Sequence, residues 1–435
     1  MKDGKTAKSL LVGVAEVDIT PPIGTNLMGS LKPRKAIGVQ DPLHAKAIVL
    51  KSGGTTIAYV LLDLCVLERN VGDAAVRLAA RRTGIPADRI VWAANHTHTA
   101  PITIQCSGFE GCIDKKWLAG IPARFAEAVA MAHRQLQPAR MSRCRGFHHG
   151  LGQNRRVRFK NGESINTWNL GQSKDIQSVG SEGPIDPEIG VLSFEDLKGR
   201  MLAVMYDYTL HTNTNFGLYL SADFPGVVAA RIRERFGPQV ISLFVPGASG
   251  NINAVPGQTY RNVGNALADV MIAKLNARKP MDGPVPVNAV KRDVVVPFRD
   301  FGKDQKTRIR DSGWTPETQE FFRKELRAMR RAGRKEARTV LQAWRIGEVG
   351  FASLPGELFV EWGLKIKRES PFPWTYPVEL GGDYLGYLIT DDGWEAGGYE
   401  ALISRVAKPS VEGVAAMVEG TLEMLNELHA KGNKS

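Results

Sequence analysis

Residues 57–65 read IAYVLLDLC, a continuous apolar run rich in branched side chains. A run of this length and composition predicts a buried β-strand. A helical stretch, AAVRLAARR, follows at 74–82, and a second strand, IVWAA, is predicted at 90–94. This order of strand, helix and strand is typical of a sheet in an α/β protein.

The same order recurs further along the chain. AVMYDYTL at 203–210 predicts a strand, VVAARIRERF at 227–236 a helix, and QVISLFV at 239–245 another strand. The segment QAWRIGEVGFASL at 342–354 reads as a hairpin, and a helix is predicted at 358–369. We therefore expect an α/β fold in which mixed sheets are flanked by helices.

Composition and length fit a globular protein with a large core. The chain has 435 residues, of which 43% are hydrophobic and 23% are charged. This length suits either two to three domains or one large α/β unit. Because both ends resemble α/β material, we expect a single catalytic domain over 1–435. Residues 285–337, with a basic helix, form an insertion or edge segment within it.

Net charge and cysteine spacing indicate the kind of partner and the cellular compartment. A net charge of +12 favours anionic partners, such as an acidic substrate, an anionic lipid surface or nucleic acid, and of these we expect no nucleic acid. The chain has no apolar stretch of the ~20 residues that a membrane span needs, and its basic start lacks the apolar core of a signal peptide. The four cysteines have no C-x-x-C spacing. We expect a soluble cytoplasmic protein.

Polar side chains follow several of the predicted strands. His96 and His98, in NHTHTAP, come directly after the strand at 90–94, and His211 follows the strand at 203–210. Glu357 follows the hairpin. In extended backbone, residues i and i+2 point to the same side, so both imidazoles of His-x-His can face one spot. A single histidine after a strand is more often structural, but histidine with carboxylate is a ligand set that suits zinc.

A series of motifs resembles, in the same order, the catalytic domain of the neutral (neutral/alkaline, non-lysosomal) ceramidases. The resemblance extends from about Val12 to Leu402, whereas longer family members add an immunoglobulin-like C-terminal domain. Here the sequence ends after one predicted helix. The motifs are VGVAEVDITPPIGTNLMGS (12–30), DPLHAKAIVL (41–50), NHTHTAP (95–101), the histidine after AVMYDYTL, SADFPG (221–226), LPGE (354–357), and GYLIT (386–390) followed by GYEA (398–401).

The resemblance implies a site. In that family a zinc ion is held by two histidines, a glutamate and a tyrosine, and the second histidine of the T-H-T-H segment contacts the substrate and the transition state. Carried over residue by residue, the implied metal ligands are His96, His211, Glu357 and Tyr387, and the implied substrate contacts are His98 and Arg155.

One departure from the family bears on mechanism. The family's serine, proposed there as the nucleophile, is replaced here by Asn253. An amide cannot form an acyl-enzyme, so we expect zinc-bound water to attack, with His98 and Arg155 stabilising the oxyanion or His98 acting as general base. Ser249 is the alternative nucleophile, although GASGN lacks the second glycine of a G-x-S-x-G elbow.

Three classes of function remain open from the sequence. The first is a zinc-dependent amidohydrolase that cleaves the N-acyl bond of a ceramide-like lipid or of a smaller N-acyl compound. The second is a related metallohydrolase acting on an ester, a lactone or another amide. The third is a non-catalytic binder of metal or of a lipid surface.

The basic segment predicts a capped helix. Thr315 precedes Pro316 at the first helical position, and Phe322, Leu326 and Met329 then fall on one stripe of a surface that is otherwise basic. Such a helix can lie on an anionic membrane. It can equally pack against the domain by its stripe, and we favour packing because three apolar residues make a weak membrane anchor.

Overall fold

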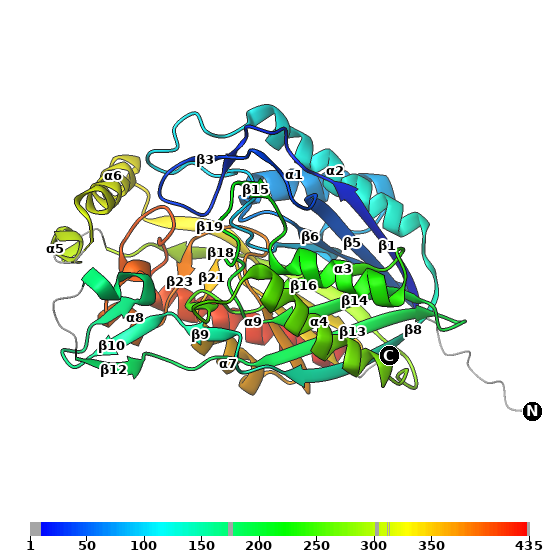
Figure 1. Cartoon of the computed structure of the whole chain (residues 1–435). Coiled ribbons are helices and arrows are strands. Elements are labelled where there is room, and N and C mark those ends of the chain that lie inside the picture. Colours follow the sequence, from blue (N-terminus) through cyan, green and yellow to red (C-terminus); the bar gives the residue numbers. More distant parts are fainter. Residues whose placement is uncertain (1–9, 173–176, 301–303, 311, 313, 433–435) are drawn as a thin grey trace, which may run out of the picture.

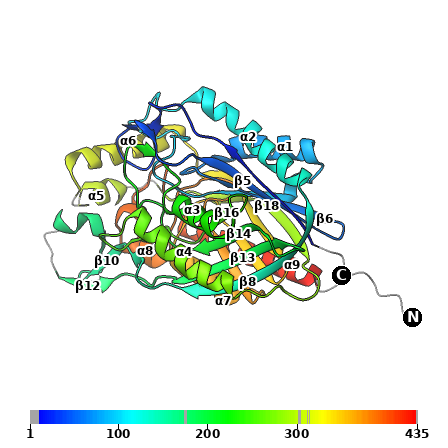
Figure 2. The ribbon, with the colours of Figure 1, turned by 45° about the vertical axis from the view of Figure 1, so that its right-hand side comes forward.

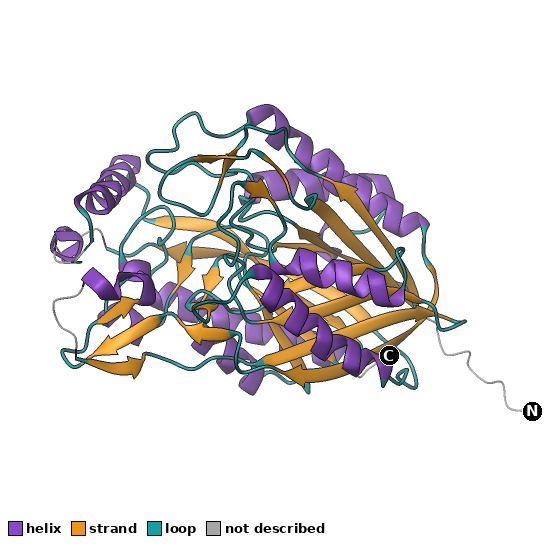
Figure 3. Cartoon of the chain, viewed as in Figure 1, coloured by secondary structure: helices purple, strands orange, loops and turns teal. Residues whose placement is uncertain are grey.

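The structure is a computed structural model that describes residues 10–172, 177–300, 304–310, 312 and 314–432. Two sheets lie face to face, and helices cover their outer faces (Figures 1 and 3). The expected α/β fold of mixed sheets flanked by helices is therefore confirmed.

The larger sheet has eight strands and contains all four strands predicted from the two strand–helix–strand units. Its neighbours pair antiparallel except for the two outermost pairs, β16 with β14 and β6 with β7, which are parallel. In spatial order the strands are β16 (Ile241–Pro246), β14 (Met201–Tyr208), β13 (Glu188–Asp196), β8 (Gln137–Phe147), β1 (Leu11–Asp18), β5 (His44–Ser52), β6 (Thr55–Leu62) and β7 (Ile90–Ala94).

The curvature of this sheet brings the ends of β7 and β14 together. Followed pair by pair, these two strands run in opposite directions, so a flat sheet would place their carboxyl ends at opposite edges. A twist of about 20–25° between neighbouring strands, summed over the strands between them, turns the two ends toward each other. The Thr212 hydroxyl after β14 donates a 2.6 Å hydrogen bond to the Asn95 carbonyl after β7.

The smaller sheet packs on one face of the larger one. Its strands are, in order, β18 (Val287–Pro297), β19 (Glu336–Ile346), β20 (Val349–Ser353) and β22 (Trp374–Val378). The predicted hairpin is confirmed as β19 and β20. Across the interface the rings of Tyr59 and Trp344 stack at 5.3 Å. Helices α7 (Val360–Glu369) and α9 (Val411–Gly432) pack on the other face of the smaller sheet.

Four helices pack against the larger sheet. Helix α1 ends at Gly84, whose φ of 74° is the left-handed value that glycine tolerates best at a helix end. Helix α3 begins at Asp223, whose carboxylate accepts from the Phe224 amide. The four are α1 (Arg69–Thr83), α2 (Lys115–Arg134), α3 (Phe224–Phe236) and α4 (Tyr260–Asn276).

Helix α6 (Pro316–Ala332) is the predicted basic helix, and it lies with α5 (Asp304–Arg310) at the end of the molecule remote from β1 and β8 (Figure 2). Thr315 caps it by accepting from the Thr318 amide. Phe322, Leu326 and Met329 are buried, and the first two pack with Leu402 and Ile403. The apolar stripe is therefore directed into the protein.

Short elements complete the described chain. None of its described helices is long and apolar enough to cross a membrane. The short strands are β2 (Asn26–Leu27), β3 (Arg34–Lys35), β4 (Gly38–Val39), β9 (Gly152–Asn154), β10 (Arg156–Phe159), β11 (Ser164–Asn166), β12 (Ser178–Ser181), β15 (Tyr219–Leu220), β17 (Ile252–Ala254), β21 (Glu357–Leu358) and β23 (Tyr387–Leu388). The short helices are η1 (Ala87–Arg89), η2 (Thr167–Gln172), α8 (Asp391–Glu395) and η3 (Tyr399–Ala401).

Candidate metal centre

Three side chains from distant parts of the chain meet at one point. The Nε2 atoms of His96 and His211 are 2.9 Å apart, and Glu357 Oε2 lies 3.3 Å from the first and 3.8 Å from the second. Ligand atoms arranged tetrahedrally around one zinc at about 2.0–2.2 Å are separated by about 3.3–3.6 Å. The three distances scatter by about 0.5 Å around this spacing, and all three residues are buried.

Main-chain carbonyls fix the orientation of the imidazole rings. Nδ1 of His96 donates to the Cys65 carbonyl at 2.9 Å, Nδ1 of His211 to the Ser249 carbonyl at 3.2 Å, and Nδ1 of His98 to the Gly29 carbonyl at 3.1 Å. A ring that carries its proton on Nδ1 presents a lone pair on Nε2. Metal-binding histidines commonly use their second nitrogen in this way.

Several atoms that carry lone pairs therefore lie close together at the meeting point. His98 Nε2 is 3.4 Å from His96 Nε2, and Glu357 Oε2 has no hydrogen-bond partner among the described residues. Lone pairs so close together repel unless a proton or a cation lies between them. The donor set thus fits a metal cation, because a cation would satisfy both the imidazoles and the orphaned carboxylate oxygen.

Burial and neighbouring charge set the protonation of the rings. Burial, followed by the nearby His96, holds the pKa of His98 and of His211 well below its ordinary value, so both are neutral. Burial also lowers the pKa of His96, but Cys65 and Glu357 together raise it well above the ordinary value. The surroundings of His96 therefore favour a positive charge at the meeting point.

The backbone at His96 differs from the prediction. Extended geometry was expected to place His96 and His98 on one side, but His96 has a φ of 69°, in the left-handed region. The chain turns there because the His96 amide donates to the Leu64 carbonyl and the His98 amide to the Thr212 carbonyl. The two rings still meet, edge to face at 4.9 Å, although by a turn and not by strand alternation.

Two glycines allow the backbone to approach these side chains. A β-carbon on Gly29 would lie 2.4 Å from the His98 ring, and its φ of +87° also disfavours other residues. A β-carbon on Gly250 would lie 2.5 Å from the Glu357 carbonyl oxygen. The Gly250 amide donates to the Leu358 carbonyl at 2.8 Å. Each glycine thus allows a loop to support one residue of the site.

Glu357 is supported by residues that the sequence analysis did not identify. The Tyr384 hydroxyl donates to Glu357 Oε1 at 2.7 Å. Glu379 accepts from the amides of Leu358 and Ser249, each at 3.1 Å, and so links the strand that carries Glu357 to the loop that orients His211. Burial raises the pKa of Glu379 to about 7. Tyrosine and glutamate at these positions carry no spacing signal in the sequence.

The Ser249 side chain is hydrogen-bonded to Glu379. Its hydroxyl donates to Glu379 Oε1 at 2.5 Å, and among the described residues that line the adjoining cavity it does not appear. Its carbonyl accepts from His211. The residue therefore orients a histidine through its carbonyl, and its hydroxyl is hydrogen-bonded to a buried carboxylate.

Arg155 and Asn253 lie side by side at the cavity wall. Arg155 Nε donates to Glu400 at 2.9 Å, and Nη1 donates to Asn253 Oδ1 at 3.2 Å. Arg155 is 2% exposed, and its Nη2 has no hydrogen-bond partner among the described residues. Both residues line the cavity, and the contact of Arg155 with a substrate stays a prediction.

Tyr387 occupies the position directly beside Glu357. In the parallel pair of β21 and β23, Glu357 is in register with Tyr387. The Arg155 guanidinium lies 5.3 Å from the centre of the Tyr387 ring, and Tyr387 lines the same cavity. The structure thus brings Tyr387 to the site, and its role as a fourth ligand stays a prediction.

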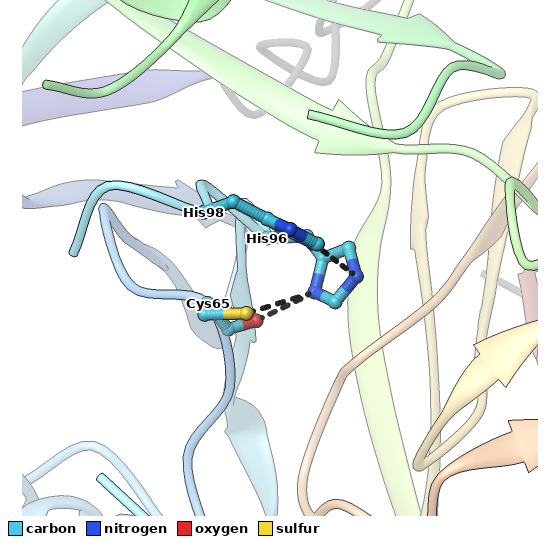
Figure 4. A group of neighbouring side chains, drawn as sticks. All are labelled: Cys65, His96 and His98. Carbon is cyan, nitrogen blue, oxygen red and sulfur yellow. Dashed lines mark hydrogen bonds between the residues drawn. The ribbon is translucent and has the colours of Figure 1, made fainter. Parts of the chain in front are cut away.

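Cys65 is a further neighbour, shown with His96 and His98 in Figure 4. Its Sγ is 3.6 Å from Nδ1 of His96, the same nitrogen that donates to the Cys65 carbonyl. Glu357 and His211 lie on the opposite, Nε2, side of this ring. Cys65 is thus placed to orient the imidazole through Nδ1. A metal ion bound to Nε2 of His96 would lie on the other side of the ring from Cys65.

The meeting point opens into a cavity of about 400 Å³. Its walls are mainly aromatic and aliphatic, and they come from loops and short elements distributed along the chain, with α6 and the segment before it. The lining residues beyond the polar centre include Met28, Leu31, Phe109, Trp168, Phe216, Trp314, Phe321, Tyr399 and Val406.

Sequence comparisons place the chain near one group of enzymes. No family model matches it. A neutral ceramidase of Pseudomonas aeruginosa is 26% identical over 230 residues, which are 49% of this chain and 32% of the relative. Neutral ceramidase A of Dictyostelium discoideum is 24% identical over 221 residues, 48% of this chain and 30% of the relative. The matched segments thus span about a third of each relative's length.

Comparison with solved structures extends the likeness to nearly the whole chain. The crystal structure of neutral ceramidase from Pseudomonas aeruginosa matches with a TM-score of 0.73 at 18% identity, covering 98% of this chain and 75% of that one. A ceramidase complexed with C2 matches with the same TM-score and identity, covering 98% of this chain and 76% of that one. The predicted resemblance is confirmed: the chain has the fold of the neutral ceramidases and matches their sequence over about half of its length.

Proposed function

We propose that this chain is a zinc-dependent amidohydrolase that cleaves the N-acyl bond of a ceramide-like lipid or of a smaller N-acyl compound. The observation that carries the proposal is the convergence of His96, His211 and the orphaned Glu357 oxygen on one point that opens into an apolar cavity. The ligand set of imidazole and carboxylate suits zinc. Relatives named neutral ceramidase favour an amide as the substrate.

Zinc would be held by His96, His211, Glu357 and Tyr387. A zinc ion at such a site would polarise a substrate carbonyl and would lower the pKa of a water molecule to about 7. Attack by water agrees with the positions of the two alternative groups, because Asn253 has no nucleophilic atom and the Ser249 hydroxyl is bonded to Glu379.

His98 is the proton carrier in this proposal. Its Nδ1 donates to the Gly29 carbonyl, so Nε2 is the atom that can take a proton from water and pass it to the leaving amine. Arg155 faces the same space with Nη2 unpartnered among the described residues, and its fixed positive charge stabilises negative charge on the carbonyl oxygen. Asn253 accepts from Nη1 and so positions the guanidinium.

The apolar walls suit the acyl part of the substrate. A volume of about 400 Å³ is near the lower end of the range of about 300–1,000 Å³ for ligand pockets. Trp314 and Phe321 form part of the wall. We therefore infer that an acyl group of short or medium length is held inside and that a longer chain extends past this wall.

The test combines metal analysis with a substrate panel. The purified protein is analysed for bound metal and assayed on N-acyl compounds of increasing chain length, with the matching esters included to separate an amidase from an esterase. His211→Ala is expected to lose bound metal and more than about a hundred-fold in turnover. His149→Ala, which changes an exposed histidine, is the matched control. Turnover that survives removal of the metal, or equal loss in both variants, contradicts the proposal.

A further inference from the structure

Exposed apolar side chains gather beside the mouth of the cavity. Five of the twelve large hydrophobic residues that are exposed in the described chain come from two neighbouring segments. Single exposed hydrophobics are ordinary, whereas a contiguous group marks a contact surface. We call this group the mouth patch; its members are Ile37 (57% exposed), Val39 (43%), Phe216 (55%), Leu218 (39%) and Tyr219 (49%).

Backbone pairing holds the two segments side by side. Strands β4 and β15 pair in parallel, with Tyr219 opposite Gly38, and the Ile37 amide donates to the Leu218 carbonyl at 2.9 Å. The Tyr219 ring lies over Gly38, where a β-carbon would be 2.8 Å from it. The mouth patch is therefore a fixed surface and not a chance grouping of loop side chains.

Arg34 ties the mouth patch to the site. Its guanidinium donates to the carbonyls of Phe216 at 2.8 Å and of His98 at 2.7 Å. Phe216 itself lines the cavity, and its ring meets the His98 ring edge to face at 5.6 Å. The apolar surface thus continues from the outside of the molecule to the cavity wall.

Basic side chains outnumber acidic ones around the mouth patch. Residues 19–41 and 212–222 contain Lys32, Arg34 and Lys35 and one acidic residue, Asp41. Asp41 is half-buried and accepts from the Ser221 hydroxyl and the Ala222 amide, while Glu317 binds Lys32 at 2.6 Å. The whole chain carries a net charge of +12, so two copies meeting through this face would bring like charges together.

We propose that the mouth patch docks on an anionic lipid surface. Aliphatic and tyrosine side chains that enter the interface, with lysines directed at acidic headgroups, are the recognised elements of peripheral membrane contact. Docking there places the cavity mouth against the membrane. The buried stripe of α6 leaves that helix without the apolar side chains for this role. Vesicle binding is measured without any substrate turnover. The outcome for docking is therefore independent of the outcome for the proposed hydrolysis.

The experiment is sedimentation with vesicles of phosphatidylcholine containing phosphatidylserine, compared with vesicles of phosphatidylcholine alone. The full chain is expected to bind the anionic vesicles, and the bound fraction should fall as salt is raised. The double variant Ile37→Ser/Leu218→Ser is expected to weaken binding at least about ten-fold, because it removes apolar area that enters the interface. Lys35→Gln should weaken binding to the anionic vesicles only.

The control is the double variant Leu197→Ser/Val295→Ser, which changes residues exposed by 58% and 54% outside the mouth patch. It should bind vesicles like the unchanged chain, and both double variants should hydrolyse a short soluble N-acyl substrate at the same rate. Absence of binding at low salt, or equal binding by the two double variants, overturns the proposal. The proposal is also overturned if light scattering shows a dimer that the Ile37→Ser/Leu218→Ser variant converts to a monomer, because this face would then bind a second copy of the chain.

Discussion

Replacing Tyr384 by phenylalanine tests whether Glu357 acts as a metal ligand that is held in place by its neighbours. The Tyr384 hydroxyl donates to Glu357 Oε1 at 2.7 Å, while Oε2 faces the two histidines. Burial and the nearby Glu357 raise the pKa of Tyr384 well above its ordinary value, so the hydroxyl keeps its proton and remains a donor. The substitution removes this donor and leaves the ring in place.

The size of the effect follows from the type of bond. A hydrogen bond to a charged group contributes about 1.5–3 kcal/mol, and loss of a residue that orients a metal ligand costs about 10–100-fold in metal affinity. The two ranges agree, because each ten-fold change in affinity corresponds to about 1.4 kcal/mol. We therefore expect Tyr384→Phe to weaken metal binding about 10–100-fold without abolishing it.

The assay is competition for zinc between the protein and a chelator of known affinity. Tyr206→Phe is the matched control, because that hydroxyl is buried and has no hydrogen-bond partner among the described residues. Its removal should leave zinc affinity unchanged. If Tyr384→Phe binds zinc as tightly as the Tyr206→Phe protein does, the carboxylate is not a ligand supported in this way and the reasoning is wrong.

Three further expectations follow from the site and its surroundings. Asn253→Ala should keep activity within about ten-fold, since it removes one neutral acceptor from Arg155, whereas His96→Ala should abolish turnover in the same assay. Trp314→Ala should shift the preferred acyl chain to greater length, measured as kcat/KM across the substrate panel, because it removes an aromatic part of the cavity wall. Burial raises the pKa of Asp223 from 3.8 to about 6, so the folded state binds more protons than the unfolded state between these values. Stability should therefore fall by about 2–3 kcal/mol as pH rises from 4 to 6; chemical denaturation of Asp223→Asn should lack this fall, and parallel curves for the two proteins would contradict the assignment.

The sequence was informative where a residue's role depends on its place after a strand. His96, His211 and Glu357 were found because each follows a run that reads plainly as a strand, and the structure brings them within 4 Å of one another. How they meet depends on the whole sheet. The strands β7 and β14 run in opposite directions, and their ends meet because the mixed sheet curls.

Other features depend on contacts across the fold and leave no local pattern. Tyr384 and Glu379 act through hydrogen bonds to residues 21–130 positions away in the chain. The left-handed backbone of His96 arises from hydrogen bonds to Leu64 and, through His98, to Thr212. A strand pattern reports burial on either side of a short segment, so it cannot report partners that only tertiary packing supplies.

The centre joins residues that are remote in the chain, and this has a consequence for the order of folding. His96 and His211 are separated by 115 positions, and Glu357 lies in the last fifth of the sequence. Closing such long loops is entropically costly, so their contacts form late. High-affinity zinc binding should therefore appear only as the last part of the chain docks, and zinc retained in a refolding experiment would report completion of the native fold.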